Sequence, residues 1–489
     1  MRTHRPTFPQ YPLKKDENEA IQWKTQTLAW LEKGRIIKQD GTILTVDDFT
    51  DLHNLAFRHN LLILTNSLTS ADFQGILDCA VRNPAHAKVA CTQIGIPFSI
   101  RLKNENRTSW LVTMDTWHLE PAYESLQRLS QIFAYFGLGT THTPASLGRN
   151  SMMYVYELNN FHKHSSPSLA VENYLRNYAV GGIVQTPQGE GKYCEETTQL
   201  DMASAYISQY RKHPTGGAVY FGGCIPGECA TYFARCIVSI KNTLPIGPFP
   251  ARDTNNRSFV RYPKETGQYT CYLWREQVED AMNAGCDVEV VEGYYWRYWT
   301  TQNYPWSQYA YFMRKSAPSE IQGDVKGITN AAMGKFGTNR ELFYLVSGDE
   351  CREKEHIVRG ITENHRPINY FVRSEANHTT PIMLHWYYYT VMQTNRVVYL
   401  FALPFAQQNR LVWMDYDSVM VIESDPVKGM YLKKYDPRML FIQPGEWIWS
   451  LWYNITIAHK GSRSFKGTQE DGTFVDHSPG YKEKEIAEM

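Results

Sequence analysis

The chain has 489 residues, 43% of them hydrophobic, and a formal net charge of zero at pH 7. This length allows two or three domains with a large buried core. The zero net charge excludes a strong overall field that would attract nucleic acid, so any basic groove must be local. No stretch of 18 apolar residues and no apolar run after a basic start occurs, which predicts a protein with no membrane span and no secretory signal. The nine Cys are scattered, and we expect reduced thiols in the cytoplasm.

The first 140 residues have a mixed α/β pattern and are expected to form a small domain. The apolar spacing predicts two strands and two helices, namely a helix-like run from Glu19 to Lys33, strands at Leu61–Leu64 and Trp110–Met114, and an amphipathic helix from Pro121 to Phe136.

A polar stretch from Thr140 to Ser168 follows and predicts a linker. Next comes Tyr178, three residues before the paired glycines Gly181 and Gly182. Two glycines beside an aromatic residue permit close backbone approach to a bound chain, and a plain turn is the alternative.

A short predicted strand ends at Asp201, where a helical turn begins. This places a carboxylate beside free backbone N–H groups that suit phosphate oxygens, although an Asp at such a junction is also a common helix N-cap.

Residues 319–337 predict a helix on which Lys326, Asn330 and Gly334 share one face, with Arg314 just upstream. A triphosphate and a base could lie on such a face, and a solvated Lys is the alternative. A second helix, rich in aromatic residues, is predicted from Pro381 to Phe405.

Two strand-like runs, Leu411–Met414 and Val419–Ile422, flank a tight turn and predict a β-hairpin with Asp415 and Asp417 at its tip. Two carboxylates so close repel each other, and a divalent cation removes the repulsion. Mg²⁺ prefers carboxylate oxygens together with substrate phosphates, and two-metal sites hold their ions about 4 Å apart. The alternative is an ordinary acidic turn. A basic segment with Lys460 and Arg463 follows and suits backbone phosphates.

Three of these segments, in this order, resemble the polymerase motifs of family B DNA polymerases, most closely the protein-primed branch of phages and linear plasmids. The segment Asp201–Tyr206 is similar to D-x-x-S-L-Y, Lys326–Phe336 to K-x-x-x-N-S-x-Y-G-K-F, and Met414–Ser418 to Y-x-D-T-D-S. Three ordered motifs are specific, whereas each one alone is not.

The resemblance implies an α+β right-hand fold with palm, fingers and a reduced thumb behind a shortened exonuclease-like α/β domain. The implied boundaries are 1–140 for the exonuclease-like domain, 141–200 for the linker and template-contacting Gly-Gly segment, 201–313 for palm with a first insertion, 314–340 for the fingers helix, 341–380 for a second insertion, 381–445 for the rest of the palm, and 446–489 for the reduced thumb.

The resemblance also implies the site. Asp201 and Asp417 would hold two Mg²⁺ ions, with Mn²⁺ as an alternative, and Asp415 would support them as a third catalytic residue. The remaining implied contacts are to substrates: Lys326, Arg314, Tyr206, Asn330, Ser204 and Gly334 to the dNTP, and Gly181, Gly182, Lys460 and Arg463 to DNA.

The implied activity is template-directed transfer of dNMPs to a primer 3′-OH or to the hydroxyl of a priming protein, so template–primer DNA, dNTPs and a terminal protein are the expected partners. Three departures from the family pattern are Met333, Tyr416 and Met414, which predict looser base-pair checking. No Asp-x-Glu occurs before residue 140, which predicts an inactive exonuclease. A catalytically idle descendant that binds DNA or a priming protein, and a template-independent nucleotidyltransferase, remain open.

Overall fold

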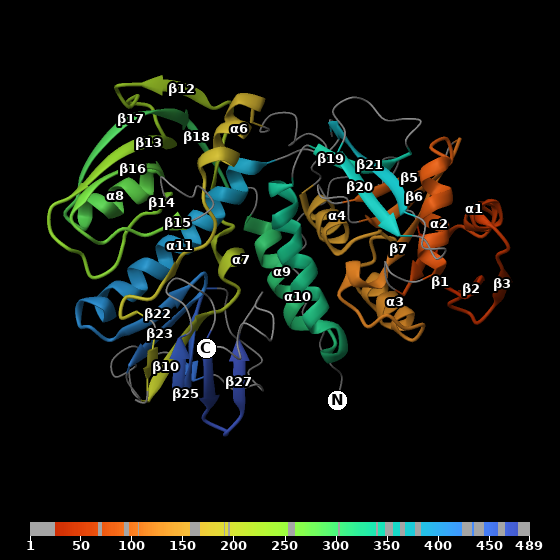
Figure 1. Ribbon diagram of the computed structural model, residues 1–489. Coiled ribbons are helices and arrows are strands. Elements are labelled where there is room, and N and C mark those ends of the chain that lie inside the picture. Colours follow the sequence, from red (N-terminus) through yellow and green to blue (C-terminus); the bar gives the residue numbers. More distant parts are fainter. Residues whose placement is uncertain are drawn as a thin grey trace. The chain divides into compact units, whose positions relative to one another are not determined.

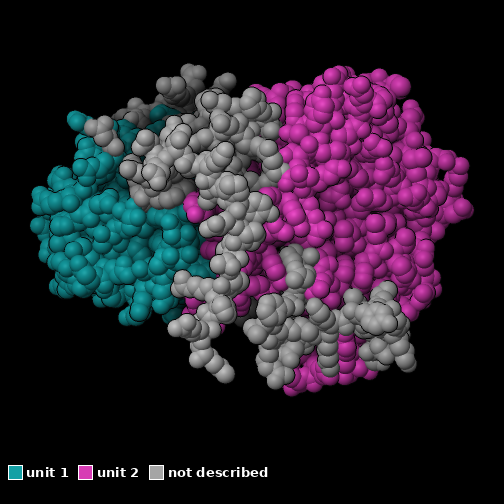
Figure 2. All heavy atoms as spheres, turned by 180° about the vertical axis from the view of Figure 1, so that it is seen from behind, with its two compact units in different colours: residues 1–147, 342–375 teal, residues 148–341, 376–489 magenta. Residues whose placement is uncertain are grey.

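The computed structural model describes most of the chain. The described residues are 25–66, 71–91, 97–105, 107–156, 167–189, 191–193, 196–252, 260–301, 304–338, 341–347, 356–361, 367–376, 383–422, 433–434, 445–457 and 465–477. The chain divides into two compact units, residues 1–147 with 342–375 and residues 148–341 with 376–489 (Figure 2). None of the described helices is long and apolar enough to cross a membrane.

Unit 1 is a ten-stranded sheet in the order β20-β21-β19-β5-β6-β7-β4-β1-β2-β3, with helices packed on it (Figure 1). Its strands are β1 Thr27–Glu32, β2 Arg35–Lys38, β3 Ile43–Thr45, β4 Leu61–Thr65, β5 Ala87–Cys91, β6 Pro97–Asn104, β7 Arg107–Thr113, β19 Glu341–Val346, β20 His356–Ile361 and β21 Pro367–Ala376. Its helical segments are α1 Phe49–Arg58, α2 Ala71–Arg82, η1 Met114–Trp117 and α3 Ser125–Phe136.

The helix predicted from Glu19 to Lys33 is wrong over its described part, because Thr27–Glu32 forms β1. Four consecutive residues of this strand are buried, and it lies parallel to the fully buried β4. A run of apolar residues that is buried on both faces has no clear period, so burial in the sheet decided between helix and strand. The strands predicted at 61–64 and 110–114 and the helix ending at Phe136 are confirmed, with Gly137 in the left-handed conformation (φ +66°).

Unit 2 is built on a nine-stranded sheet with the path β27-β26-β25-β10-β23-β22-β8, where β24 and β9 also pair with β25. These strands are β8 Val184–Gln185, β9 Gly191–Tyr193, β10 Thr197–Met202, β22 Leu411–Asp415, β23 Ser418–Ile422, β24 Lys433–Lys434, β25 Trp447–Ile457, β26 Phe465–Gln469 and β27 Phe474–His477. The predicted hairpin at 411–422 is therefore confirmed.

Smaller sheets and helices complete unit 2. One sheet has four strands, in the order β12 Val219–Gly222, β17 Asp287–Trp296, β13 Thr231–Ile240 and β16 Gly267–Trp274. Two further sheets have two strands each: β11 His213–Thr215 with β18 Tyr298–Thr300, and β14 Ala251–Arg252 with β15 Val260–Arg261. The helical segments are α4 Pro144–Tyr156, which begins in unit 1, α6 Leu169–Tyr178, α7 Ala205–Gln209, α8 Arg275–Asn283, α9 Tyr304–Ser316, η2 Ser319–Ile321, α10 Gln322–Gly334, η3 Lys335–Gly337 and α11 Leu384–Gln407.

Helix α11 packs on one face of the nine-stranded sheet, over its central strands (Figure 1). Its apolar residues pack with side chains of β10, β22 and β23, among them Leu200, Met202, Met414 and Val419. Since side chains alternate between the two faces of a strand, the residues next to these project from the opposite face.

The stretch from Thr140 to Ser168, predicted as a linker, contains α4 instead. Gly148 of α4 lies so close to α10 that a Cβ atom there would overlap the backbone of Ile328. The helix is therefore part of the scaffold that holds α10, and its polar composition concealed this close packing.

Candidate active site

Two of the predicted acidic residues, Asp201 and Asp415, lie in register on strands β10 and β22, one on each side of β23. In the sheet β23 lies between β10 and β22, and Ser418 pairs with Asp201 on one side and with Asp415 on the other. All three follow or precede residues that pack on α11, so they project from the opposite face of the sheet. The two Asp residues are two strand spacings apart, about 10 Å between backbones, with a small side chain between them.

Asp417 lies in the turn between β22 and β23, beside the end of β10. The backbone N–H of Met202 donates to the carbonyl oxygen of Asp417 (2.7 Å). The N–H of Tyr416 donates both to the carboxylate of Asp415 (2.6 Å) and to the carbonyl of Ile183 (3.0 Å). The turn is therefore bonded to the neighbouring strand and to the segment before β8.

The charges of this cluster act on one another. The pKa of Asp201 is raised from 3.8 to about 7, chiefly by burial and in addition by the negative charges of Asp417 and Asp415, while Lys326 opposes the shift. A carboxyl that is half protonated at neutral pH, facing two carboxylates and one ammonium, is typical of a site that binds a cation or a polar ligand.

The donor atoms fit a hard cation such as Mg²⁺, since all are carboxylate oxygens. Among the described residues, no three His, Cys, Asp or Glu side chains are grouped closely enough to hold a metal ion by themselves. Mg²⁺ is commonly bound by one or two carboxylates plus substrate phosphates rather than by a cage of protein ligands. The arrangement therefore fits an ion that is held jointly by the protein and a phosphate-bearing substrate.

Lys326, Asn330 and Gly334 are exposed on α10, as the helical spacing predicted. Arg314 of α9 reaches this helix from a buried position, with only 6% of its surface exposed. Its guanidinium donates to Thr329 Oγ1 (2.6 Å), Asn330 Oδ1 (2.5 Å) and Ser204 Oγ (3.2 Å).

Arg314 thus links α9, α10 and the turn after β10, and it would have to leave these partners to contact a triphosphate. Burial lowers the pKa of its guanidinium to about 9.

The turn between β10 and α7 has an unusual backbone. Ser204 has left-handed dihedral angles (φ +50°, ψ +45°), which cost free energy for a residue other than glycine and concentrate at functional sites. Tyr206 follows in α7, and its pKa is raised chiefly by burial, with further contributions from Asp417 and Tyr416. The phenol therefore lies near the acidic turn. No local sequence signal indicates the strained residue.

The predicted glycine segment lies against the acidic turn. A Cβ atom at Gly182 would overlap the ring of Tyr416, whereas a Cβ atom at Gly181 would meet nothing within 4 Å. The amide of Asn395 on α11 bonds to the backbone of the same segment. Sequence reasoning missed Asn395, whose only signal is a polar residue in an aromatic helix. Lys460 and Arg463 lie outside the described residues.

Comparisons with known proteins identify the family of the chain and its fold. A sequence model of the family described as DNA polymerase type B, organellar and viral, matches residues 122–398, more than half of the chain. No curated protein matches the sequence.

Solved structures of Phi29 DNA polymerase have a similar fold. Its ternary complex with primer-template DNA and incoming nucleotide substrates superposes with a TM-score of 0.70 at 14% identity, over 96% of this chain and 93% of that one. Its binary complex with primer-template DNA gives 0.67 over the same shares, and its complex with single-stranded DNA gives 0.65 over 96% and 92%. The likeness establishes the α+β right-hand fold that the three motifs implied.

The raised pKa of Asp201 predicts how the apo protein responds to pH. The folded state keeps a proton that the unfolded state releases near pH 4, so stability falls as the pH rises from about 4 to about 7 and stays level above that. Asp201→Asn should therefore increase the free energy of unfolding in EDTA at pH 8 by up to about 4 kcal/mol, and by less at pH 5. The increase should appear as a higher melting temperature.

Asp287→Asn is the control, because Asp287 is exposed and pairs with Lys241. It should change stability little at either pH. A destabilised Asp201→Asn variant at pH 8 would contradict the electrostatic description.

The contact between Gly182 and Tyr416 predicts a steric difference between the two glycines. Gly182→Ala should destabilise the protein by about 1–3 kcal/mol in urea unfolding, because the added methyl displaces the ring. Gly181→Ala should be close to neutral. In the double variant Gly182→Ala/Tyr416→Ala the ring is absent, and a coupling of at least about 0.5 kcal/mol should appear. Equal effects of the two Ala substitutions would disprove the contact.

Proposed function

We propose a mechanism for this chain, which belongs to the organellar and viral type B DNA polymerases and is a DNA-directed DNA polymerase. By this mechanism the enzyme adds dNMPs to a primer 3′-OH, or to a priming-protein hydroxyl, through two-metal phosphoryl transfer and without proofreading. The observation that supports this most is the strand register, which brings Asp201 and the Asp415–Asp417 turn together at one end of three neighbouring strands. The positive charge of Lys326 is close enough to oppose the rise in the pKa of Asp201.

Asp201 and Asp417 would hold the two ions, Mg²⁺ or alternatively Mn²⁺, with Asp415 as their support. When bound, the ions would supply charge neutralisation for the attacking 3′-oxygen, the α-phosphoryl group and the departing pyrophosphate. The carboxylates orient the reacting groups in line, and such positioning provides much of the rate. Their mutual repulsion in the apo protein favours binding of cations.

The helices supply the nucleotide site. The exposed ammonium of Lys326 would bind the triphosphate, and Asn330 and Gly334 would line the nascent base pair. Tyr206 would lie under the sugar and exclude a 2′-OH. Arg314 would act indirectly, because its hydrogen bonds hold Asn330 and Ser204 in place.

DNA would contact the chain at Gly181 and Gly182 on the template side and at Lys460 and Arg463 along the backbone phosphates. Phi29 DNA polymerase, which has a similar fold, was solved with primer-template DNA, and this likeness supports DNA as a ligand of the chain. Template–primer DNA and dNTPs are thus the proposed partners, with a terminal protein where the primer is a protein hydroxyl. The proposed location is the cytoplasm, of the host cell for a viral enzyme.

Primer extension tests the proposal. Wild type should extend an annealed primer with dNTPs and Mg²⁺, and the product should follow the template. Asp417→Ala should reduce the rate at least about a thousandfold, because it would remove one of the two carboxylates that hold the ions. Asp287→Ala, which removes an exposed carboxylate of the same unit, should leave the rate unchanged.

Extension that survives Asp417→Ala would refute the mechanism. A wild type that binds DNA without incorporating nucleotide would indicate an idle descendant, and product independent of template would indicate a template-independent transferase.

The absence of proofreading has its own assay. A 3′-labelled single strand incubated with wild type and Mg²⁺ should keep its length, because the acidic pair Asp-x-Glu is missing before residue 140. Shortening that EDTA abolishes would contradict this part of the proposal.

A further inference from the structure

Asn395 is a buried polar residue near the middle of α11, with 5% of its surface exposed. Its Oδ1 accepts from the backbone N–H of Ile183 (2.9 Å), and its Nδ2 donates to the carbonyl of Gly181 (3.0 Å). These partners are more than 200 positions away in the chain. The neighbouring Thr394 instead donates to Thr390 within its own helix (2.9 Å). The amide therefore serves the glycine segment rather than the helix.

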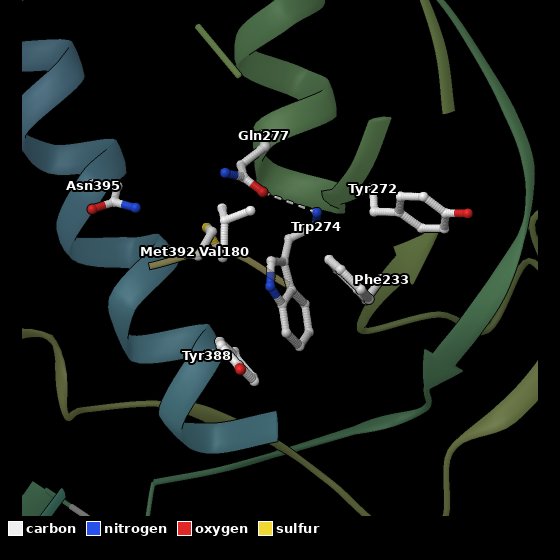
Figure 3. Close-up of a pocket in the computed structure, with 8 residues that line it drawn as sticks. All are labelled: Val180, Phe233, Tyr272, Trp274, Gln277, Tyr388, Met392 and Asn395. Carbon is white, nitrogen blue, oxygen red and sulfur yellow. Dashed lines mark hydrogen bonds between the residues drawn. The ribbon is translucent and has the colours of Figure 1, made fainter. Parts of the chain in front are cut away.

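Figure 3 shows Asn395 on α11 near Val180, which immediately precedes the glycines. Both line a small pocket whose other walls are mainly aromatic. Truncation of Asn395 enlarges this pocket and introduces no clash, so an Ala variant is expected to fold.

The opposite side of the segment is bonded to the acidic turn. The carbonyl of Ile183 accepts from the N–H of Tyr416 (3.0 Å), which also donates to the carboxylate of Asp415 (2.6 Å). The ring of Tyr416 lies against Gly182. One residue, Ile183, is thus held by Asn395 through its N–H and by the acidic turn through its carbonyl.

We infer that Asn395 is a positioning residue that fixes the Gly181–Ile183 backbone against the acidic turn and thereby orients Asp415. Through the same contacts it holds the glycines where the template strand passes, a part of the inference that rests on the proposed function. A buried amide that bonds on both sides is costly to remove, because each backbone partner is left without a hydrogen bond.

Hydrogen exchange tests the coupling without DNA or turnover. In Asn395→Ala, peptides covering residues 179–187 and 411–419 should exchange about tenfold faster, since both ends of the clamp loosen. Asn395→Asp keeps an acceptor for Ile183 but loses the donor to Gly181, so it should accelerate exchange mainly in the first peptide.

Thr394→Val is the matched control, because it removes a buried hydroxyl bonded only within α11, and it should leave both peptides unchanged. The inference is overturned if Asn395→Ala leaves the 411–419 peptide at the wild-type rate, or if the control accelerates it equally.

Binding of a labelled primer–template duplex in Ca²⁺ tests the consequence for DNA. Asn395→Ala and Asn395→Asp should each weaken binding about tenfold, and Thr394→Val should not. Wild-type affinity in both Asn395 variants would overturn the template part. If wild type binds no duplex, the proposed function fails, and the exchange experiment still decides whether Asn395 positions the turn.

Discussion

Repulsion among the carboxylates of Asp201, Asp415 and Asp417 is the constraint on which this site depends. The strands β10, β23 and β22 are hydrogen-bonded neighbours, so the sheet register brings these charges together at a cost in free energy. The pKa of Asp201 is raised to about 7, chiefly by burial and in addition by the charges of Asp417 and Asp415. A site that is destabilised without a ligand binds cations favourably, because binding relieves the repulsion.

Packing holds the charged edge in place. Helix α11 buries apolar side chains against the sheet, which leaves the alternate, acidic positions on the opposite face. The same helix holds the glycine segment through Asn395, while Arg314 joins α9 and α10 to the turn after β10. The scaffold therefore fixes the acidic turn, the glycine segment and the face of α10 by separate contacts.

Local pattern was sufficient for some of these elements. The hairpin at 411–422, the strand ending near Asp201 and the helix carrying Lys326 follow from alternation, turn residues and helical spacing. That they belong together could be inferred only from the resemblance of three ordered motifs, because strand order is not encoded locally.

The remaining features depend on contacts between residues far apart in the chain. Residues 27–32, predicted as helix, form a strand that is buried on both faces. The predicted linker contains helix α4, which packs closely on α10 at Gly148. Arg314 is buried because its partners lie in three different segments. In the sequence Asn395 is only a polar residue within an aromatic helix, and its role follows from its backbone partners, which lie far away in the chain.

Crystals of the protein with primer–template DNA, Mn²⁺ and a non-hydrolysable dNTP would test the central claim most directly. Anomalous scattering should reveal two manganese ions about 4 Å apart, bound by the carboxylates of Asp201 and Asp417 and by the triphosphate. Manganese bound elsewhere, or a triphosphate seated away from these two carboxylates, would contradict the account.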